Sequence, residues 1–154
     1  MVKTLPSTEA NIRESVKGAD ILIGAVLLPG GKAPVAVTRE MVASMRKGSV
    51  LVDVSVDQGG CIETTRPTTH DNPIYTELGV IHYCVLNMPG AYPRTSTLAL
   101  TASTLPYIKK LAGKGFRGAV DEGYAPIITA ANTHMGKVVH KGLSESTGLK
   151  AANL

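Results

Sequence analysis

Apolar runs alternate with helix-like segments along the first part of the chain. Three runs, each followed by a segment that contains Gly or Pro, cover residues 21–28, 50–56 and 80–86. Residues 7–18, ahead of the first run, and residues 38–48, ahead of the second, repeat apolar positions at helical spacing and end in Gly. Strands that alternate with helices in this way form βαβ units, so the pattern predicts a parallel sheet with right-handed crossovers.

The remaining segments show weaker patterns. We interpret residues 57–79 as a long loop that contains a short helix near residues 73–78. Further along, residues 95–112 predict a long helix with a kink at Pro106. Residues 117–148 are predicted to be helical in parts, and we expect no strand beyond the three runs.

The end of the second run holds the most informative residues. Its apolar positions lead into Asp57-Gln58-Gly59-Gly60, so a buried strand would carry a carboxylate to its carboxyl end, next to glycines that let a ligand approach the backbone. Open α/β sheets bind ligands outside these ends of their strands. Asp57 is therefore a candidate functional residue, although an aspartate here can equally cap the next turn. We expect Asp57 at the carboxyl end of its strand, beside the ends of the first and third runs.

Composition narrows the class of protein. With 154 residues, of which 44% are hydrophobic and 18% charged, the chain is long enough to bury a core and is not of the disordered type. The net charge of +4 is spread along the chain and aromatic residues make up only 4%, which argues against a nucleic-acid-binding surface. No apolar run has membrane-spanning length, and the N-terminus lacks the apolar core of a signal peptide. We expect a soluble, cytoplasmic protein with no nucleic-acid or membrane partner.

The cysteines and histidines give no metal-binding pattern. Cys61 and Cys84 are widely spaced, and Cys84 lies in an apolar run, where it is predicted to be a small core residue. The 4 histidines lack the short spacings of metal ligands, so we assign none of them to a metal or to catalysis. His82, on the third run, is predicted to be packed or half exposed, and His134 is a candidate helix cap.

Three strands make only part of a doubly wound sheet. A complete dinucleotide-binding domain begins with a Gly-x-Gly-x-x-Gly turn between a strand and a helix, with an acidic residue about 20 positions later. Residues 113–118 match these letters, but they follow a helical segment, which indicates a coincidental match. The fold class predicted from the sequence is therefore α/β, the second half of a Rossmann-like parallel sheet with C-terminal helices.

Four segments of the chain resemble the alanine dehydrogenase and pyridine-nucleotide transhydrogenase family. They are residues 19–34 (ADILIGAVLLPGGKAP), 52–60 (VDVSVDQGG), 66–70 (RPTTH) and 83–97 (YCVLNMPGAYPRTST). The segments are long and ordered, and the resemblance covers nearly the whole chain. Asp57-Gln58-Gly59-Gly60 is similar to the dehydrogenase branch, whereas the transhydrogenase branch more often has Glu-Asn or Glu-Gln before the glycines.

The resemblance implies a cofactor domain and a helical extension. Residues 1–93 resemble the C-terminal half of an NAD-binding domain, and residues 94–154 resemble helices that belong to the substrate domain. The implied activity is the reversible NAD-dependent conversion of L-alanine to pyruvate and ammonia by a homo-oligomer, a hexamer in the intact enzyme.

The same resemblance bears on the activity of this chain alone. The family's glycine-rich turn and substrate-binding residues do not occur in the matched part, so we expect the chain to be inactive by itself. Two alternatives stay open. One is the nucleotide-binding part of a pyridine-nucleotide transhydrogenase, and the other is a non-catalytic binding or oligomerisation module.

The resemblance also implies roles for individual residues. Asp57 resembles the catalytic aspartate beside the nicotinamide and the substrate amino group. Ser7 resembles an adenosine-side contact, and Arg66 resembles a polar contact to the cofactor. The implied cofactor-binding residues are Ser7, Val26, Leu27, Val54, Ser55, Val56, Arg66, Val85, Leu86, Asn87 and Met88.

Without the resemblance, several of these residues have simpler interpretations. Val26 and Leu27 are then apolar core positions, and Arg66, which precedes a proline, is a solvated loop charge. Asn87 is as typical of a turn as of a ligand contact. For Asp57, the functional interpretation and the interpretation as a structural cap lead to clearly different predictions.

Overall fold

The structure is a computed structural model that describes residues 2–154. Its contacts divide the chain into two compact units. Unit 1 comprises the described residues up to Leu28 together with Lys32–Met88. Unit 2 comprises Pro29–Gly31 and Pro89–Leu154.

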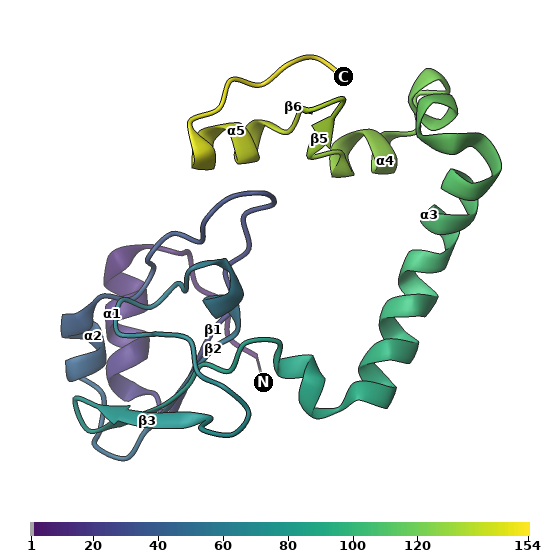
Figure 1. Cartoon of the computed structure of the whole chain (residues 1–154). Helices are drawn as coiled ribbons and strands as arrows, with labels where there is room; N and C mark the ends of the chain where they lie inside the picture. The colour runs from purple at the N-terminus through teal and green to yellow at the C-terminus, as the bar shows by residue number, and fades with distance from the viewer. Residues whose placement is uncertain (1) are drawn as a thin grey trace. The chain divides into compact units, whose positions relative to one another are not determined.

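Unit 1 is a layered α/β structure in which two helices pack against a four-stranded sheet (Figure 1). Its elements are α1 (Glu9–Gly18), β1 (Ile21–Gly24), α2 (Arg39–Ala43), β2 (Val50–Asp53), the 3-10 helix η1 (Val54–Gln58), β3 (Ile74–Glu77) and β4 (Val80–Tyr83). This confirms the α/β class and the alternation of strands and helices predicted from the sequence.

The sheet is parallel over three of its strands. The strand order is β1-β2-β4-β3, so β1 and β3 form the two edges. β1, β2 and β4 run parallel, as predicted, whereas β3 runs antiparallel to β4. The register pairs Gly24 with Asp53 and Val52 with Tyr83, which brings the carboxyl ends of the parallel strands to one end of the sheet.

Each parallel strand is shorter than the apolar run that predicted it. β2 shows the physical reason, because the Asp53 side chain accepts a hydrogen bond from the Ser55 N–H at 2.9 Å and turns the chain into η1. Asp57 therefore lies in a helical turn that follows β2. The expectation that Asp57 ends a strand was wrong in this detail.

The segment predicted as a loop with a short helix contains a strand instead. Ile74 pairs with Tyr83 and Glu77 with Val80, so β3 and β4 form a hairpin with two residues in its turn. Those residues, Leu78 and Gly79, have φ of 55° and 78°, the left-handed conformation that two-residue hairpin turns need. The helical interpretation failed because pairing with β4, not local propensity, decides the backbone here.

The two helices of unit 1 begin near the starts of the helical segments predicted at residues 7–18 and 38–48, and a threonine caps each of them. The Thr8 hydroxyl accepts a hydrogen bond from the Asn11 N–H at 3.3 Å, and α1 ends at Gly18 as expected. The Thr38 hydroxyl accepts one from the Met41 N–H at 3.4 Å. α2 ends at Ala43, earlier than the spacing of its apolar residues predicted.

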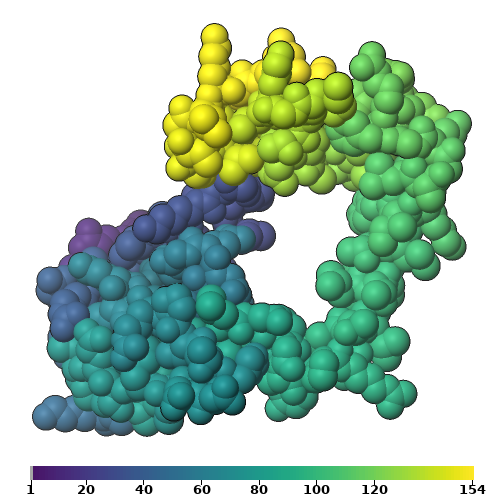
Figure 2. Space-filling view, in the orientation of Figure 1, coloured from purple at the N-terminus to yellow at the C-terminus, as the bar shows by residue number. Residues whose placement is uncertain are grey.

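The core of unit 1 lies between these helices and one face of the sheet. Val16 of α1 and Met41 of α2 pack in the same buried cluster as Leu51 of β2 and Val80 of β4. The next inward-facing residue on β4, His82, is fully buried, so of the two predicted alternatives, packed or half exposed, the first holds. Figure 2 shows the atoms of unit 1, in purple to teal, as one continuous packed mass. Cys84 is also fully buried, as predicted.

β1 departs from the prediction of a buried strand. Ile21 and Ile23 are 64% and 63% exposed, because β1 is an edge strand and their side of it carries no packed layer among the described residues. On the other side, Gly24 is buried against the loop that holds Cys61 and Ile62. A β-carbon at Gly24 would lie 2.6 Å from the Cys61 Sγ and 3.0 Å from the Ile62 Cδ1.

Unit 2 consists mainly of helices. Its elements are α3 (Pro93–Asp121), α4 (Ala125–Ala130), β5 (Thr133–His134), β6 (Lys137–Val138) and α5 (Lys141–Thr147), and the short turn η2 (Met88–Ala91) precedes them. α3 leaves helical geometry at Gly115, where φ is 68°, and not at the predicted Pro106. Gly tolerates this backbone, which is why the break lies there.

The β5–β6 hairpin was not predicted from the sequence. Its turn residues Met135 and Gly136 have φ of 49° and 74°, which again suits a two-residue connection. His134 lies in β5, so the prediction that it caps a helix was wrong. His140 has that role instead, since its Nδ1 accepts a hydrogen bond from the Leu143 N–H at the start of α5.

Candidate functional site

The buried carboxylate of Asp53 holds the loop that follows β2. Besides the Ser55 N–H, it accepts hydrogen bonds from the Cys61 N–H at 3.0 Å and the Thr65 hydroxyl at 2.7 Å. Asp53 is fully buried, and its two oxygens have protein donors in place of water. A single side chain therefore joins the end of β2 to residues 8 and 12 positions further along.

Gly60 allows this close packing of the loop. Its φ is 78°, and a β-carbon there would lie 2.7 Å from the Thr65 Oγ1 and 3.0 Å from the Asp53 Oδ2. Gly59, at φ 93°, is covered by the aliphatic chain of Lys32, whose Cε a β-carbon would meet at 2.8 Å. Gly59 is thus favoured for its backbone shape, and Gly60 for backbone shape and for space.

Asp57 lies in η1 and is exposed, beyond the carboxyl ends of the parallel strands. Its two carboxylate oxygens lie 3.3 and 3.4 Å from the Asn87 N–H, which donates to them from the segment after β4. Asp57 does not cap the turn that contains it, since Asp53 supplies that bond. The carboxylate is thus held at one point and remains open to a ligand, as the functional interpretation requires.

Ser55 joins the ends of two neighbouring strands. Its hydroxyl donates to the Val26 carbonyl at 2.8 Å and accepts from the Val26 N–H at 2.8 Å. Val26 is half buried and Val56 is buried, whereas Leu27 and Val54 are 65% and 49% exposed. The exposed pair leaves apolar surface at the same end of the sheet as Asp57.

The segment after β4 contributes a second set of predicted residues. Val85 is fully buried, while Leu86 is 43% exposed and Asn87 is exposed. Met88 is half buried. Asn87 is the member of this set that contacts Asp57, and it does so through its backbone N–H.

Ser7 lies on a different surface. It lines a groove of about 570 Å³ between α1, with the residues that precede it, and the edge strand β1. Val26 lines the same groove, together with Gly24 and the half-buried Leu22. The groove is mainly apolar with a few hydroxyl and amide groups at its rim, a lining that suits a flat, weakly polar ligand.

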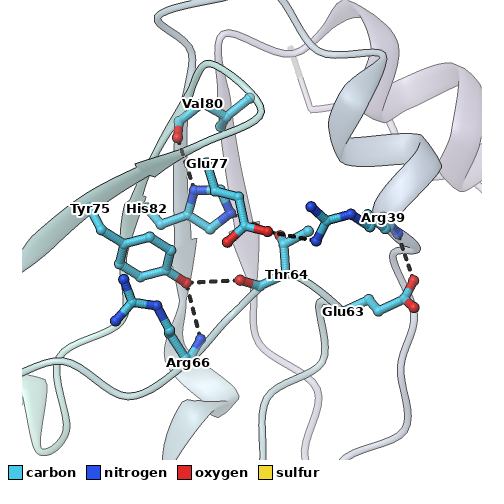
Figure 3. Close-up of polar contacts among 8 residues, drawn as sticks. All are labelled: Arg39, Glu63, Thr64, Arg66, Tyr75, Glu77, Val80 and His82. Carbon is cyan, nitrogen blue, oxygen red and sulfur yellow. Dashed lines mark hydrogen bonds and ion pairs between the residues drawn. The ribbon is translucent and has the colours of Figure 1, made fainter.

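Arg66 belongs to a cluster on the β3 side of the sheet (Figure 3). Its guanidinium carbon lies 4.0 Å from the centre of the Tyr75 ring, and the backbone N–H of Arg66 donates to the Tyr75 hydroxyl at 3.0 Å. That hydroxyl donates to the Thr64 carbonyl at 2.9 Å, and the ring stacks on His82 at 4.8 Å. The predicted cofactor contact is thus a cation held on an aromatic face, and its contacts here do not include Asp57.

The protonation pattern of His82 follows from its partners. Nδ1 lies 2.9 Å from the Val80 carbonyl oxygen, which can only accept, so Nδ1 carries the hydrogen. In the neutral ring Nε2 then accepts from the Thr64 hydroxyl at 2.8 Å. His82 is satisfied on both sides and acts as a structural link between β4 and the loop before Arg66.

Burial raises the pKa of three groups of unit 1 and so favours their neutral forms. Desolvation raises the pKa of the Cys61 thiol and of the Cys84 thiol, and it raises the pKa of the Tyr75 hydroxyl well above its usual range. A thiol needs its ionised form to act as a nucleophile. Neither cysteine is therefore a candidate for chemistry. Residues 2–154 hold no group of three or more His, Cys, Asp or Glu side chains placed to bind a metal ion.

Sequence reasoning missed two residues of this region. Asp53 was taken for part of an apolar strand, although an aspartate two residues before a serine at a strand end is a sign of a side-chain-capped turn. His70 had no assigned role, yet its Nε2 lies 3.2 Å from the Asn87 carbonyl oxygen. No spacing in the sequence indicates the contact between His70 and Asn87, because these residues lie in different loops, 17 positions apart.

A model of a known protein family matches most of the chain. The model of "Alanine dehydrogenase/PNT, C-terminal domain" matches residues 1–141. The chain belongs to this family. The family resemblance inferred from the sequence is thereby confirmed.

Curated relatives point to the dehydrogenase branch. The chain is 52% identical over 150 residues to an alanine dehydrogenase of Staphylococcus haemolyticus, a match that covers 97% of this chain and 40% of that protein. It is 54% identical over 149 residues to an alanine dehydrogenase of Methanococcus maripaludis, with 96% and 40% covered. The chain thus spans about 40% of the length of the curated relatives it matches.

Solved structures agree with the fold. An L-alanine dehydrogenase superposes with a TM-score of 0.72 at 46% identity, covering 92% of this chain and 38% of that one. A transhydrogenase from Sinorhizobium meliloti superposes with a TM-score of 0.62 at 31% identity, covering 87% and 36%. The first likeness confirms the Rossmann-like fold class. The family uses pyridine nucleotides, as its name and fold imply.

No helix in the described part of the chain combines the length and the apolar character that a membrane crossing needs.

Proposed function

We propose that this chain forms the nicotinamide-side half of the NAD-binding domain, with attached helices, of an L-alanine dehydrogenase. The proposed reaction is the reversible oxidative deamination of L-alanine to pyruvate and ammonia. In this proposal unit 1 corresponds to the cofactor domain, and residues 94–154 belong with the substrate domain. The observation that carries the proposal is the exposed Asp57 carboxylate, anchored on Asn87 at the carboxyl end of the parallel strands.

The arrangement suits hydride transfer from an amino acid. NAD, when bound, accepts the hydride from the substrate carbon, which requires a rigid and water-poor contact between the two. Leu27 and Val54 offer exposed apolar surface for such a contact, and Ser55 fixes the strand ends that carry them. Asp57 stabilises the positive charge that develops on the substrate amino group and takes or returns protons when water adds to the imine.

The remaining predicted cofactor residues are proposed to contribute along the length of NAD. The groove that contains Ser7 and Val26 accounts for an adenosine-side contact. Val85–Met88 pass beside the nicotinamide, where the backbone of Asn87 is already oriented by Asp57. Arg66, positioned on Tyr75, supplies a fixed cation at a distance from the reacting atoms.

The wider setting is also part of the proposal. NAD is proposed as the cofactor in preference to NADP, and a homo-oligomer, a hexamer in the intact enzyme, is proposed as the assembly. We propose a cytoplasmic location. For the chain of 154 residues on its own we expect no alanine oxidation.

A transhydrogenase is the second candidate, supported by the solved structure at 31% identity. The dehydrogenase is favoured because the superposed alanine dehydrogenase is more similar, at 46% identity. The Asp57-Gln58-Gly59-Gly60 sequence also resembles that branch. Cofactor-to-cofactor hydride transfer without alanine would favour the transhydrogenase.

The test is steady-state kinetics of the full-length subunit to which these residues belong in the proposal. Wild-type enzyme is expected to reduce NAD only when L-alanine is added. Asp57→Asn keeps the shape of the side chain and removes its charge, so kcat is expected to fall by about 10²–10⁴-fold, as for a positioned acid–base group. Asp71→Asn, an exposed aspartate of another loop, is the control and should leave kcat unchanged. Near-normal kcat in Asp57→Asn would contradict the proposal.

A further inference from the structure

The peptide group of Asn87 and its carbonyl are held from two sides. The Asn87 N–H donates to the Asp57 carboxylate at 3.3 and 3.4 Å. The Asn87 carbonyl oxygen lies 3.2 Å from Nε2 of His70. Because a carbonyl can only accept, Nε2 of His70 must carry the hydrogen and donate it. The three residues form a chain of hydrogen bonds from His70 through the Asn87 backbone to Asp57.

The backbone of Asn87 needs this support. Its φ is 53°, in the left-handed region that few residues other than glycine adopt without cost. Asparagine tolerates the conformation better than most residues, but it also tolerates others, so the peptide orientation is not fixed by local preference alone. The bonds from His70 and to Asp57 select the one orientation that points the N–H at the carboxylate.

An isolated parallel bridge beyond the end of β4 brings His70 to this position. Thr68 and Val85 form a parallel bridge, in which the Thr68 N–H donates to Cys84 and the Leu86 N–H donates back to Thr68, at 2.9 and 3.1 Å. Two residues further along each of these segments, the same parallel register places His70 opposite Asn87. The Thr68 hydroxyl also donates to the Pro73 carbonyl at 3.0 Å, which closes the loop that carries His70.

We propose that His70 is a positioning residue for Asp57. Its imidazole holds the Asn87 carbonyl and thereby restrains the backbone of Asn87, whose N–H fixes the direction of the Asp57 carboxylate. The hydrogen-bond chain rests on the described contacts alone. The effect of His70 on catalysis rests, in addition, on the proposed function. His70 is exposed and lies outside the core, so its replacement removes this contact and leaves the fold in place.

The first experiment tests the hydrogen-bond chain without any activity. Amide hydrogen exchange of Asn87 is measured by NMR in the 154-residue chain, as wild type, His70→Ala, His70→Gln and Asp71→Ala. Loss of the His70 contact is expected to speed exchange at Asn87 by about tenfold, the effect of one net hydrogen bond. Gln offers an amide N–H at a similar reach and should restore protection, and Asp71→Ala should match wild type. Unchanged exchange in His70→Ala overturns the proposal.

The second experiment tests the consequence for catalysis in the full-length dehydrogenase subunit. His70→Ala is expected to lower kcat by about tenfold or more while the KM for NAD changes by less than about threefold, because a misdirected Asp57 affects reaction and not binding. His70→Gln should recover most of kcat. Equal losses in the Ala and Gln variants, or a loss confined to KM, overturn the proposal.

The two experiments separate the inference from the function on which it rests. If the wild-type subunit does not oxidise alanine, the proposed function fails and with it the catalytic role of His70. The exchange measurement still decides whether the hydrogen-bond chain exists. If wild type is active and His70→Ala is fully active, the proposed function stands and the positioning role is overturned.

Discussion

At the scale of single residues, two aspartates four positions apart have opposite environments. Asp53 is fully buried and accepts three backbone or hydroxyl hydrogen bonds, whereas Asp57 is exposed and accepts from one N–H. One carboxylate holds the loop and the other faces outward from it. We therefore expect Asp53 to contribute to the stability of the fold and Asp57 to contribute to chemistry.

Asp53→Asn is expected to destabilise unit 1. The amide places a donor among the Ser55 N–H, the Cys61 N–H and the Thr65 hydroxyl, so at least one buried donor loses its acceptor, at a cost of about 1–3 kcal/mol. Urea unfolding of the 154-residue chain measures this. Asp57→Asn is the matched control and should stay within about 0.5 kcal/mol of wild type, as is usual for exposed sites. Equal stability of the two variants would mean that Asp53 has no such anchoring role.

At the scale of the element, the turn from η1 into the following loop depends on backbone geometry that only glycine supplies at low cost. Gly60 combines a φ of 78° with atoms of Thr65 and Asp53 that would lie within 3.0 Å of an added β-carbon. Gly48 has a similar φ of 85° with nothing within 4 Å. Alanine replacements at Gly60 and Gly48 therefore separate two effects on stability, the strain of a left-handed backbone and the steric clash of the added β-carbon.

Gly60→Ala is accordingly expected to cost more stability than Gly48→Ala. Both replacements carry the backbone cost of about 1–2 kcal/mol for a left-handed residue. Only the first also displaces Thr65 or Asp53, which adds roughly 1–3 kcal/mol through a disturbed buried hydrogen bond. Thermal or urea unfolding of both variants gives the comparison. A smaller loss for Gly60→Ala than for Gly48→Ala would contradict the described packing.

The end of α3 is expected to depend on pH through Glu122. Hydrogen bonds from Lys110 and Lys114 lower the pKa of the Glu122 carboxyl from 4.5 to about 2. A carboxyl whose pKa is lowered by folding stabilises the folded form when ionised, so the contribution is complete above pH 4.5 and is lost as the pH falls toward about 2. Because the group is exposed, the effect should be small and local.

Amide exchange along α3, followed as the pH is lowered, measures this effect after correction for the intrinsic exchange rate. Protection near Glu122 should decrease between pH 4.5 and about 2 in wild type and be independent of pH in Glu122→Gln. Glu145→Gln removes a comparable carboxylate from a Lys–Glu pair in α5 and should leave the α3 profile unchanged. A wild-type profile retained in Glu122→Gln would assign the pH dependence to another group.

At the scale of the whole molecule, apolar surface remains uncovered in both units. Ile21 and Ile23 are exposed on the edge strand β1, and Leu98 and Leu100 are 62% and 64% exposed on α3. An edge strand with exposed β-branched residues can pair with a strand of another chain. The 154-residue chain is therefore expected to associate as its concentration rises.

Ile23→Lys is expected to reduce this association, because a charge on an edge strand opposes pairing with a second strand. Sedimentation velocity over a range of concentrations measures the change. Val2→Lys adds the same charge at a position that is 91% exposed and outside any strand, and it should associate as wild type does. Identical distributions for Ile23→Lys and wild type would show that β1 does not mediate the association.

The sequence alone determined the class of fold and the position of the candidate site along the chain. Alternating apolar runs predicted the three parallel strands, and helical spacing predicted the two helices that begin near residues 7 and 38. These features are local, since they depend on residues a few positions apart. The family resemblance rested on equally local segments, and the family match confirmed it.

Only the tertiary structure decided the features that depend on distant partners. β3 is a strand because β4 lies beside it, Asp53 is an anchor because Cys61 and Thr65 return to it, and Asn87 meets both Asp57 and His70 across separate loops. Hydrogen bonds between segments far apart in the sequence leave no periodic pattern in it. A carboxylate or a histidine therefore shows its role only when the fold supplies its partner.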